Sequence, residues 1–385
     1  MLYLPMNKFI AGKHITVHSN EELEYKSFLP SSINREFIAR DQSTITLLEE
    51  ATRLIGELNA YSRLVPDIDY FIQMHVKTEA ISSSRIEGTR TEIDEVLLPE
   101  EEIDPERRDD WREVRNYINA MNRSIEGLKQ LPVSSRLIKE THATLLSGVR
   151  GKHKMPGEIR TSQNWIGGSS IRTAHFVPPS HGEVPELLSD WEKFWHNSSI
   201  NVPVLIKIAT MHYQFETIHP FLDGNGRIGR LLITLQLIER GFLSKPVLYI
   251  SDYFEEHRQA YYDALDKVRR ENDLEGWIRF FLEGIVMTSN KGKQKFENII
   301  TLRETYDHKI VTLGRKVPRA RKLLLHLFSQ PIVSVNDVAK VLEVTFRSAN
   351  ELVMDLVDLN ILQEKTGYSR NRLFEVKDYV TLFRK

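Results

Sequence analysis

The densest group of chemically active side chains lies between His219 and Arg230, in the run HPFLDGNGRIGR. Gly224 and Gly226 allow positive φ, so consecutive backbone N–H groups can converge on one anion. Arg227 and Arg230 lie three residues apart, share one helical face and offer guanidinium forks that suit phosphate oxygens. The run therefore predicts a phosphate-binding loop at the start of a helix, where the helix dipole also favours an anion.

Two further residues of this run add a metal ligand and a base. Asp223 is an oxygen ligand of the kind that Mg²⁺ takes together with substrate phosphates. His219 stands beside the loop and can accept a proton from an attacking hydroxyl. The residue types together indicate a site for nucleotide phosphates, a metal ion and general-base chemistry.

Two helices must position this loop. Before it, apolar residues recur at helical spacing over residues 202–218, and Pro220 disfavours helical geometry at His219, so the helix is expected to end there. After it, a second apolar stripe predicts a helix with Arg240 in its last turn and Gly241 at its stop. The two stripes consist of Val204, Ile208, Met211, Phe215 and Ile218, and of Ile228, Leu231, Leu232, Leu235 and Ile238.

Other interpretations of these residues compete. Residues 224–229 spell the G-x-G-x-x-G dinucleotide fingerprint, but that fingerprint follows a strand, whereas a long helix precedes this loop. His212, Glu216 and His219 fall at i, i+4 and i+7 and offer a zinc site, although Pro220 turns His219 away from the helix. The third alternative is an ordinary glycine-rich connection with solvated arginines. It would not explain why so many functional residue types lie together between His219 and Arg230.

The run from His219 to Arg230 resembles the signature of Fic-domain proteins, HxFx(D/E)GNGRxxR, at every defined position, and the preceding residues 209–218 look similar to the same family. The resemblance covers about residues 36 to 290. It implies transfer of AMP from ATP to a Ser, Thr or Tyr hydroxyl of a target protein, including self-modification. Relatives with kinase chemistry carry lysine at the position of Gly226, so this glycine favours AMP transfer.

The same resemblance implies roles for individual residues. His219 would be the catalytic base and Asp223 the ligand of Mg²⁺, the expected cofactor. The implied nucleotide-binding residues are Gly224, Asn225, Gly226, Arg227, Ile228, Gly229, Arg230 and, as an adenine contact, Tyr262.

A second motif, Ser83-x-x-x-Glu87-Gly88, ends a helical pattern that begins near Asp67. On its own it is a helix end with Gly88 as a left-handed cap. It also resembles the inhibitory motif of Fic proteins, (S/T)xxxE(G/N), and the resemblance implies that the Glu87 carboxylate reaches Arg230. An Arg–carboxylate fork competes with the ATP γ-phosphate for the same donors, so the chain is expected to inhibit itself.

Residues 151–181 are rich in glycine and proline and predict a β-hairpin around a turn at 167–170. In Fic proteins a hairpin in this position, the flap, holds an extended target segment over the active site through main-chain hydrogen bonds. The resemblance implies these target-binding residues: Ile166, Gly167, Gly168, Ala174, His175 and Phe176. An ordinary surface hairpin is the alternative.

Composition narrows the class of protein. With 385 residues, 41% apolar content and a formal net charge of −1, the chain can form large cores but has no global basic field. It has no cysteine, which excludes disulfides and thiolate catalysis and fits a reducing cytoplasm. No run of about 18 apolar residues occurs, so we expect a cytoplasmic protein that neither spans nor binds a membrane.

Local patterns organise the rest of the chain. Residues 1 to about 35 are expected to be irregular, and 94–110 to be an acidic loop. Further helices are expected at 38–64, from 67 to the Ser83 motif, and at 111–128, 134–146, 187–195, 255–270 and 277–286.

The C-terminal part changes character. A charged helical stretch, 291–316, leads to two short helices starting near Ser334 and Thr345 and then to a basic segment at 365–372. This order resembles a winged-helix domain. The following cations can meet phosphates: Arg347, Lys365, Arg370 and Arg372. Such modules also mediate protein contacts, so the sequence leaves DNA and protein open as partners, and homodimerisation as well.

The patterns together predict a mainly α-helical protein: a Fic helical core with a small β-hairpin flap and a C-terminal winged-helix domain. The expected divisions are 1–110, a helical region with the inhibitory motif; 111–290, the catalytic core; and 291–385, a helical linker and the winged helix. The expected function is AMP transfer from ATP, autoinhibited by Glu87. Removal of AMP by the same site, and a nucleotide-sensing DNA-binding regulator, are the alternatives.

Overall fold

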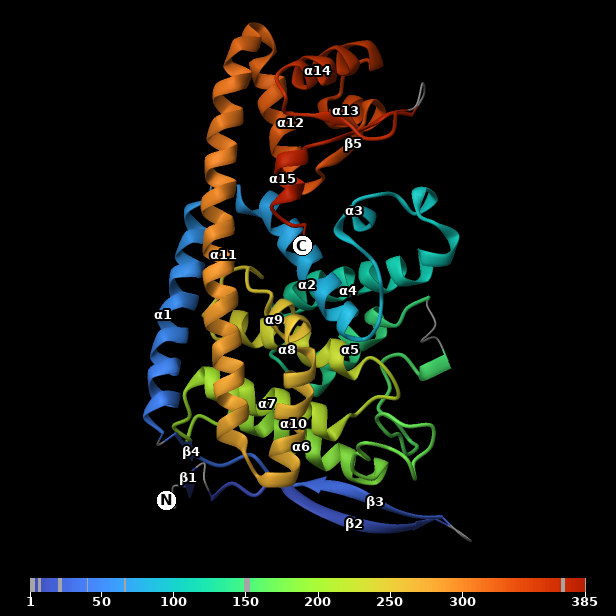
Figure 1. The fold of residues 1–385 in the computed structure, drawn as a ribbon, viewed down its shortest axis with the longest axis vertical. Helices are drawn as coiled ribbons and strands as arrows, with labels where there is room; N and C mark the ends of the chain where they lie inside the picture. Colours follow the sequence, from blue (N-terminus) through green and yellow to red (C-terminus); the bar gives the residue numbers. More distant parts are fainter. Residues whose placement is uncertain are drawn as a thin grey trace.

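The protein is mainly helical, as the computed structural model in Figure 1 shows. The structure describes residues 4–5, 8–19, 23–39, 41–65, 67–148, 153–367 and 371–384. Short strands occur only near the two ends of this described part. Within it, no helix is long and apolar enough to cross a membrane.

The N-terminal region is not irregular, so that expectation was wrong. Strands β2 (Gly12–Ser19) and β3 (Leu23–Pro30) form an antiparallel hairpin in register from Gly12↔Pro30 to Ser19↔Leu23. Two-residue strands β1 (Leu4–Pro5) and β4 (Phe37–Ile38) pair in parallel. The hairpin is held because Phe28 is buried against the body, whereas most of β2 is exposed. Ser27 and Pro30 of β3 are buried as well, so one strand anchors a ribbon whose own sequence pattern is weak.

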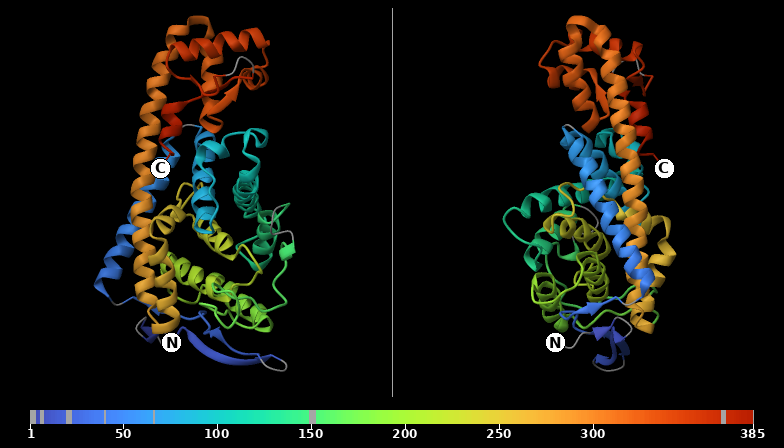
Figure 2. Two further views of the ribbon diagram at one scale, coloured as in Figure 1. Left: turned by 45° about the vertical axis from the view of Figure 1, so that its right-hand side comes forward. Right: turned by 90° about the vertical axis from the view of Figure 1, so that its left-hand side faces the viewer.

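Helices α1 (Gln42–Leu64) and α11 (Leu274–Ile310) run side by side along the molecule (Figures 1 and 2). The sequence suggested two separate helical stretches at 277–286 and 291–316, but α11 continues through 37 residues. Nothing in this stretch breaks a helix, and Gly292 packs closely on Leu58 of α1. Helix α11 is thus one continuous element that contacts both the central helices and the C-terminal part.

The central helices surround the predicted site. Helices α7 (Val204–Ile218) and α8 (Asn225–Glu239) form its middle, and α7 is buried on every side from Leu205 onward. Such a helix lies inside a core rather than on its surface. Packed around this pair are α2 (Ile68–Ile86), α4 (Arg108–Gly127), α5 (Ser135–Leu145), α6 (Val184–His196), α9 (Ile250–Glu256) and α10 (Arg258–Glu271).

The expected acidic loop at 94–110 contains short helical turns: α3 (Ile93–Val96), η2 (Glu100–Glu102) and η3 (Pro105–Arg107). A capping box between Glu92 and Glu95 starts the first of them. Their local caps allow these turns despite the prolines. A further short turn, η5 (His181–Glu183), precedes α6.

The C-terminal unit, residues 317–384, follows the turn η6 (Val311–Lys316). Its elements are α12 (Val317–Ser329), β5 (Ile332–Ser334), α13 (Val335–Leu342), α14 (Phe346–Asp358), β6 (Gln363–Glu364), β7 (Leu373–Glu375) and α15 (Lys377–Thr381). The strands form an antiparallel sheet in the order β5-β7-β6. The Phe71 and Phe328 rings lie 4.5 Å apart, so this unit packs directly on α2.

Candidate active site

The two predicted helices, α7 and α8, are present and are joined by the loop of residues 219–224; this helix–loop–helix unit is called the elbow below. Helix α7 ends at Ile218, and His219 adopts left-handed geometry with φ 50° and ψ 61°. The Asn225 side chain closes the loop, because its Oδ1 accepts from the Phe221 amide at 2.8 Å and its Nδ2 donates to the Phe221 carbonyl at 2.9 Å. Gly224, at φ 76°, then leads into α8. The Asn225 side chain therefore shapes the loop, and only its backbone amide is left for an anion.

His219 is set up as a neutral base. Its Nδ1 lies 3.4 Å from the Glu216 carbonyl, which favours the tautomer with the proton on Nδ1 and leaves Nε2 as the acceptor. Burial, assisted by the cations of Arg160 and Arg269, lowers the pKa of His219 to about 4. The imidazole is therefore uncharged at neutral pH.

Arg160 anchors this histidine, a role that the sequence did not reveal. The Arg160 side chain is 2% exposed, and its Nε donates to the His219 carbonyl at 2.9 Å. Its guanidinium also donates to the carbonyls of Ser162 and Pro179, and its backbone amide donates to the Pro220 carbonyl. One buried arginine thus joins the base of the predicted flap to the loop that begins at His219, and no local motif around residue 160 signals it.

The loop after His219 faces α5 and α4. His142 of α5 contacts the Asp223 carbonyl with Nε2 at 3.0 Å and stacks on Phe221 at 3.7 Å between ring centroids. Arg227 is 6% exposed at its side chain and donates to Glu113 of α4 at 3.1 Å, with Asp223 at 3.6 Å. These contacts hold the loop against α5 and bring the charged groups of Asp223 and Arg227 within 3.6 Å of each other.

Arg230 and the Glu87 motif meet, as expected. Arg230 Nη2 lies 2.6 Å from Glu87 Oε1, and the Arg230 side chain is 1% exposed. The same guanidinium donates to Ser83, from Nε to Oγ at 2.9 Å and from Nη2 to the carbonyl at 2.8 Å. Burial by itself raises the pKa of Glu87, but the charges of Arg230 and Arg227 bring it below its usual value. Glu87 is therefore a carboxylate, held by the arginine that was predicted to bind phosphate.

Two glycines of α8 make room for carboxylates. A Cβ on Gly226 would overlap Glu87 Oε1, and a Cβ on Gly229 would overlap Glu216 Oε1. Burial raises the pKa of Glu216 to about 7. Ile228 is different: its side chain is fully buried and its amide donates to the Gly224 carbonyl, so it presents no group to the site. Gly88, with φ 102°, ends α2 as the left-handed residue predicted for it.

The flap forms a turn with a single antiparallel bridge, between Ile166 and Phe176, rather than two strands. Gly167 and Gly168 both have φ 70° and make the turn, and a Cβ on either would overlap its neighbours. The remaining flap residues, Ala174 and His175, lie on the returning arm, where the His175 amide donates to the Ile166 carbonyl. The bridge is short because Gly167 and Gly168 bend the chain immediately after Ile166.

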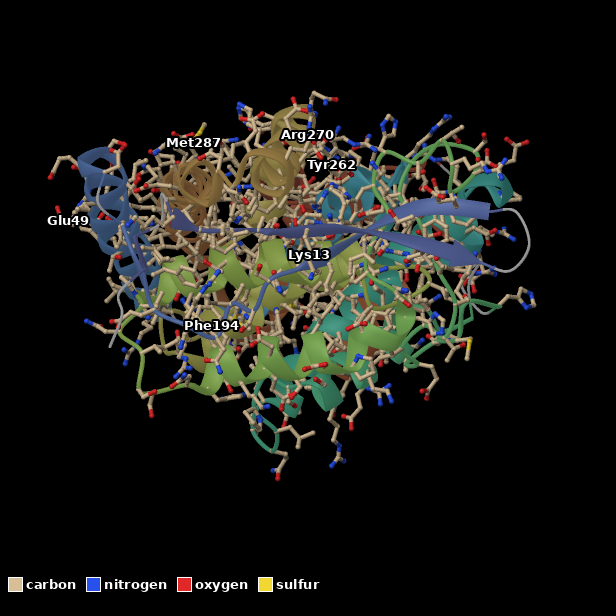
Figure 3. The ribbon with its side chains drawn as sticks, turned by 90° about the horizontal axis from the view of Figure 1, so that it is seen from below. Lys13, Glu49, Phe194, Tyr262, Arg270 and Met287 are labelled. Atoms are coloured by element: carbon tan, nitrogen blue, oxygen red, sulfur yellow. The ribbon has the colours of Figure 1, made fainter. Side chains whose placement is uncertain are left out.

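Tyr262 lies on α10 beside a cavity of about 680 Å³ that also has the flap as a wall. Its side chain is 40% exposed, whereas its neighbour Tyr261 is buried. Figure 3, seen from below, shows Tyr262 and Arg270 on this helix, with the β2–β3 hairpin crossing in front of the core. The lining includes Ile166, His175, Phe176, Glu216, Tyr262 and Arg269. The structure thus brings Tyr262 and the flap together around one space next to Glu216.

The ring nitrogens of His212 are not available to bind zinc. His212 Nδ1 lies 3.1 Å from the Gly229 carbonyl and Nε2 lies 2.9 Å from the Tyr261 hydroxyl. Both ring nitrogens are therefore engaged by protein groups inside the core. Among the described residues, no cluster of three or more His, Cys, Asp or Glu side chains is arranged to hold a metal ion.

Each described C-terminal cation of the predicted set contacts other protein groups. Arg347 is 91% exposed at its side chain and pairs with Glu351. Lys365 points back to the body, with Nζ 2.7 Å from Asp94 Oδ1. Arg372 contacts Glu364 and Asn350, and Arg370 lies outside the described residues.

Two family models match adjacent segments of the chain. The Fic/DOC family N-terminal model matches residues 45–126, which contain Ser83 and Glu87, and the Fic/DOC family model matches residues 132–237, which contain the whole 219–230 run. The chain is a Fic/DOC family protein.

Its named Fic relatives are distant. A protein adenylyltransferase Fic from Aedes aegypti is 35% identical over 128 residues, which are 33% of this chain and 23% of that protein. One from Drosophila grimshawi is 29% identical over 251 residues, 63% of this chain and 47% of that protein. A probable protein adenylyltransferase from Aquifex aeolicus is 30% identical over 203 residues, 53% of this chain and 60% of that protein. The chain therefore matches less than two thirds of each.

Two solved structures share the Fic fold. A Fic family protein from Desulfovibrio desulfuricans G20 superposes with a TM-score of 0.56 at 19% identity, covering 88% of this chain and 97% of that one. A Fic domain containing signaling protein from Bacteroides thetaiotaomicron superposes with a TM-score of 0.54 at 18% identity, covering 64% and 97%. These matches show a mainly helical Fic fold with small sheets.

Proposed function

We propose that this protein transfers AMP from ATP to a hydroxyl of a target protein and that Glu87 keeps the enzyme in an inhibited state. One observation carries the proposal: the neutral base His219 stands next to a helix N-terminus whose arginine, Arg230, is already holding a carboxylate. A site that holds Glu87 in this way offers the donors that a nucleotide phosphate needs. The names of the distant relatives agree with this chemistry.

The proposed reaction is an in-line displacement at the α-phosphorus of ATP. The target hydroxyl oxygen forms a bond to this phosphorus, the bond to the β-phosphate oxygen breaks, and pyrophosphate leaves. His219 Nε2 takes the hydroxyl proton, since Nδ1 is directed to the Glu216 carbonyl. General-base assistance of this kind typically contributes about 10²–10⁴-fold in rate.

Charge that develops on the phosphates would meet the first turn of α8. The amides of this turn have no partner within the helix and point toward its N-terminal end. Arg227, held by Glu113, adds a fixed positive charge at the same end. Donors that are already in place cost no reorganisation when the charge develops.

The Asp223 carboxylate suits a Mg²⁺ ion whose other ligands are mainly the phosphates of the substrate. Asp223 is 44% exposed at its side chain, and the described contacts of its carboxylate use Oδ1, with the Gly224 amide at 2.6 Å and Arg227 at 3.6 Å. Mg²⁺ is usually held by one or two carboxylates together with phosphates and water, which matches a single available oxygen here. When bound, the ion would neutralise phosphate charge.

Glu87 would inhibit by occupying Arg230. With its carboxylate 2.6 Å from Nη2, the arginine fork is not free for a γ-phosphate. Rotation of Glu87 away from Gly226 would free both the fork and the space above the α8 amides. A coupling of about 1–3 kcal/mol between the two states would give roughly 5- to 150-fold control.

The experiment follows label from ATP carrying ³²P at the α-phosphate into protein, in the presence of Mg²⁺. We expect weak self-labelling of the wild type, strong labelling of Glu87→Gly, and none of Glu87→Gly/His219→Ala. Glu126→Gly is the matched control, because Glu126 lies near the end of α4, is exposed and pairs with the equally exposed Lys129. It should label like the wild type.

Two further arms separate the alternatives. Label from the γ-phosphate but not from the α-phosphate would indicate kinase chemistry and contradict the proposal. Release of AMP from pre-labelled protein by the wild type, with no labelling by Glu87→Gly, would assign AMP removal to the site instead.

A further inference from the structure

A second cavity lies between the C-terminal unit and the body, away from the elbow. It has a volume of about 520 Å³, within the range of small-molecule sites. One wall is the segment from Val96 to Pro99 with Trp111 and Arg115 of α4, and the other wall belongs to α12, β5 and α13. No residue of the His219–Arg230 run lines it. It is therefore a separate space from the proposed nucleotide site.

The cavity has a guanidinium without a matching carboxylate. Arg115 is half-buried, its guanidinium lies 5.4 Å from the centre of the Trp111 ring, and burial lowers its pKa. Within the described part of the chain, no carboxylate lies within ion-pair distance of Arg115. A half-buried cation that rests on an indole and lacks a carboxylate is a natural partner for an anion.

Neighbouring charges strengthen this preference. Lys77, on α2, is 3% exposed and donates to the Ser329 carbonyl at 3.0 Å; burial and the charge of Arg115 lower its pKa to about 7. Lys340 is exposed on the opposite wall. Asp337, the carboxylate among the described lining residues, accepts hydrogen bonds from the amide and hydroxyl of Ser334 and keeps its negative charge. The described lining thus carries two cationic side chains, Arg115 and Lys340, against one carboxylate.

The remaining lining is apolar. Leu97 and Leu98 face the cavity from the body, and Ile332, Val333 and Val341 face it from the C-terminal unit. Leu97, Ile332 and Val333 are already buried, whereas Leu98 and Val341 are half-buried. A flat apolar group would remove the surface that these two leave exposed from water, at about 25 cal/mol per Å² buried. The charged and apolar parts therefore select a ligand that has both.

We propose that this cavity binds an organic anion with a flat apolar body and an oxyanion head, with the head on Arg115 and the body between α3 and the C-terminal unit. The guanidinium fork accepts a carboxylate or a phosphate with paired hydrogen bonds. Because the ligand would touch both walls, its binding would fasten the C-terminal unit to the segment that follows the Glu87 motif.

The test is calorimetric titration of the full chain, without ATP, using 2-naphthoate, 2-naphthyl phosphate and the uncharged 2-naphthamide. We expect one site for at least one of the anions and at least about tenfold weaker binding of the amide, which corresponds to about 1.4 kcal/mol. Arg115→Gln should lose this preference. Arg112→Gln is the matched control, one turn earlier on α4, where Arg112 pairs with Glu100 at the surface.

A second variant places the site. Val341→Trp fills the cavity from the wall opposite Arg115 and should abolish binding, with circular dichroism showing that the fold is kept. The anion that binds more tightly identifies the head group. Unchanged binding in both Arg115→Gln and Val341→Trp, or no binding of either anion at millimolar concentration, would overturn the proposal.

Discussion

Gly226 and Glu87 occupy one space: a Cβ on Gly226 would overlap Glu87 Oε1 and lie 2.9 Å from Arg230 Nη1. The glycine near the start of α8 therefore has two tasks. It leaves the helix N-terminus open for a phosphate, and it leaves room for the carboxylate that lies there in the structure. Both the proposed inhibitory group, the Glu87 carboxylate, and the proposed substrate phosphate need the space that a side chain at position 226 would fill.

We predict that Gly226→Ala destabilises the wild type but not Glu87→Gly. Alanine normally stabilises a helix interior by about 1 kcal/mol over glycine. Here its methyl expels Glu87 from Arg230, and separating this partly buried pair should lower the free energy of unfolding by about 1–3 kcal/mol. In Glu87→Gly the overlap with the carboxylate is gone and only the 2.9 Å approach to Arg230 Nη1 remains. A small shift of that guanidinium end can relieve this contact, so the helix preference should dominate. Thermal and urea unfolding measure both effects.

The control for this prediction is Gly56→Ala. Gly56 lies in α1, and among the described residues no neighbouring atom comes within 4 Å of the place that a Cβ would take there. Alanine should therefore be neutral or stabilising at this position in both backgrounds. Equal effects of Gly226→Ala in the wild type and in Glu87→Gly would mean that the methyl and the carboxylate do not compete.

The motif regions were predictable because their signals are local. Pro220 ends α7, Gly224 and Asn225 shape the loop, and the apolar stripes on both sides belong to real helices. The meeting of Glu87 with Arg230, 143 residues later in the chain, was expected only from the resemblance to Fic proteins. Helical periodicity alone describes the Glu87 motif as an ordinary helix end.

The features that escaped prediction depend on distant partners. Nothing in the sequence distinguishes Arg160 from other basic residues. Its role follows only from the structure, in which its guanidinium donates to carbonyls of three segments. The β2–β3 hairpin depends on Phe28, whose ring lies 6.0 Å from that of Phe176 in the flap. Asp94 was assigned to an acidic loop, yet it contacts Lys365 and Arg384 of the C-terminal unit. None of these contacts leaves a periodic trace in the sequence.

The pH dependence of labelling should show a base with a low pKa. Burial, Arg160 and Arg269 hold the pKa of His219 at about 4, below the ordinary 6.5. Only the neutral imidazole accepts a proton, so activity should be lost as the pH falls through about 4 and should not change around 6.5. The kcat/KM of Glu87→Gly should stay level between about pH 6 and pH 8. An acid limb centred near 6.5 would contradict the buried, neutral state.

Arg160→Lys should lower kcat more than it weakens ATP binding. Lysine keeps the charge but cannot reach the carbonyls of His219 and Pro179 at once, so the imidazole would lose its fixed position. Small misplacements of this kind cost up to about 10²-fold in rate. Labelling kinetics and ATP titration on the Glu87→Gly background separate the two quantities.

Arg136→Lys is the control for Arg160→Lys, since Arg136 is an exposed arginine that pairs with Glu140 along α5. It should leave kcat and ATP binding unchanged. If Arg160→Lys keeps full kcat while circular dichroism shows an intact fold, the arginine does not position His219.

Asp94 should contribute a pH-dependent part of the stability. Its carboxylate lies 2.7 Å from Lys365 Nζ and takes two hydrogen bonds from Arg384, at 2.9 and 2.6 Å. The Arg384 hydrogen bonds, opposed in part by burial and assisted by Lys365, lower the pKa of Asp94 from 3.8 to about 2. Because the folded pKa is the lower one, the contribution is complete above about pH 4 and disappears as the pH falls through about 2.

Asp94→Asn should therefore lower the free energy of unfolding by about 0.5–1 kcal/mol at neutral pH, a value that allows for the partial exposure of all three side chains. The difference from the wild type should shrink toward pH 2, where the wild-type carboxyl is itself protonated. Asp69→Asn is the control, because Asp69 is 73% exposed and pairs with Lys245 at the surface. A deficit in Asp94→Asn that is the same at pH 7 and near pH 2 would mean that the side chain acts through packing, and that the C-terminal unit is not held to the body by this charge.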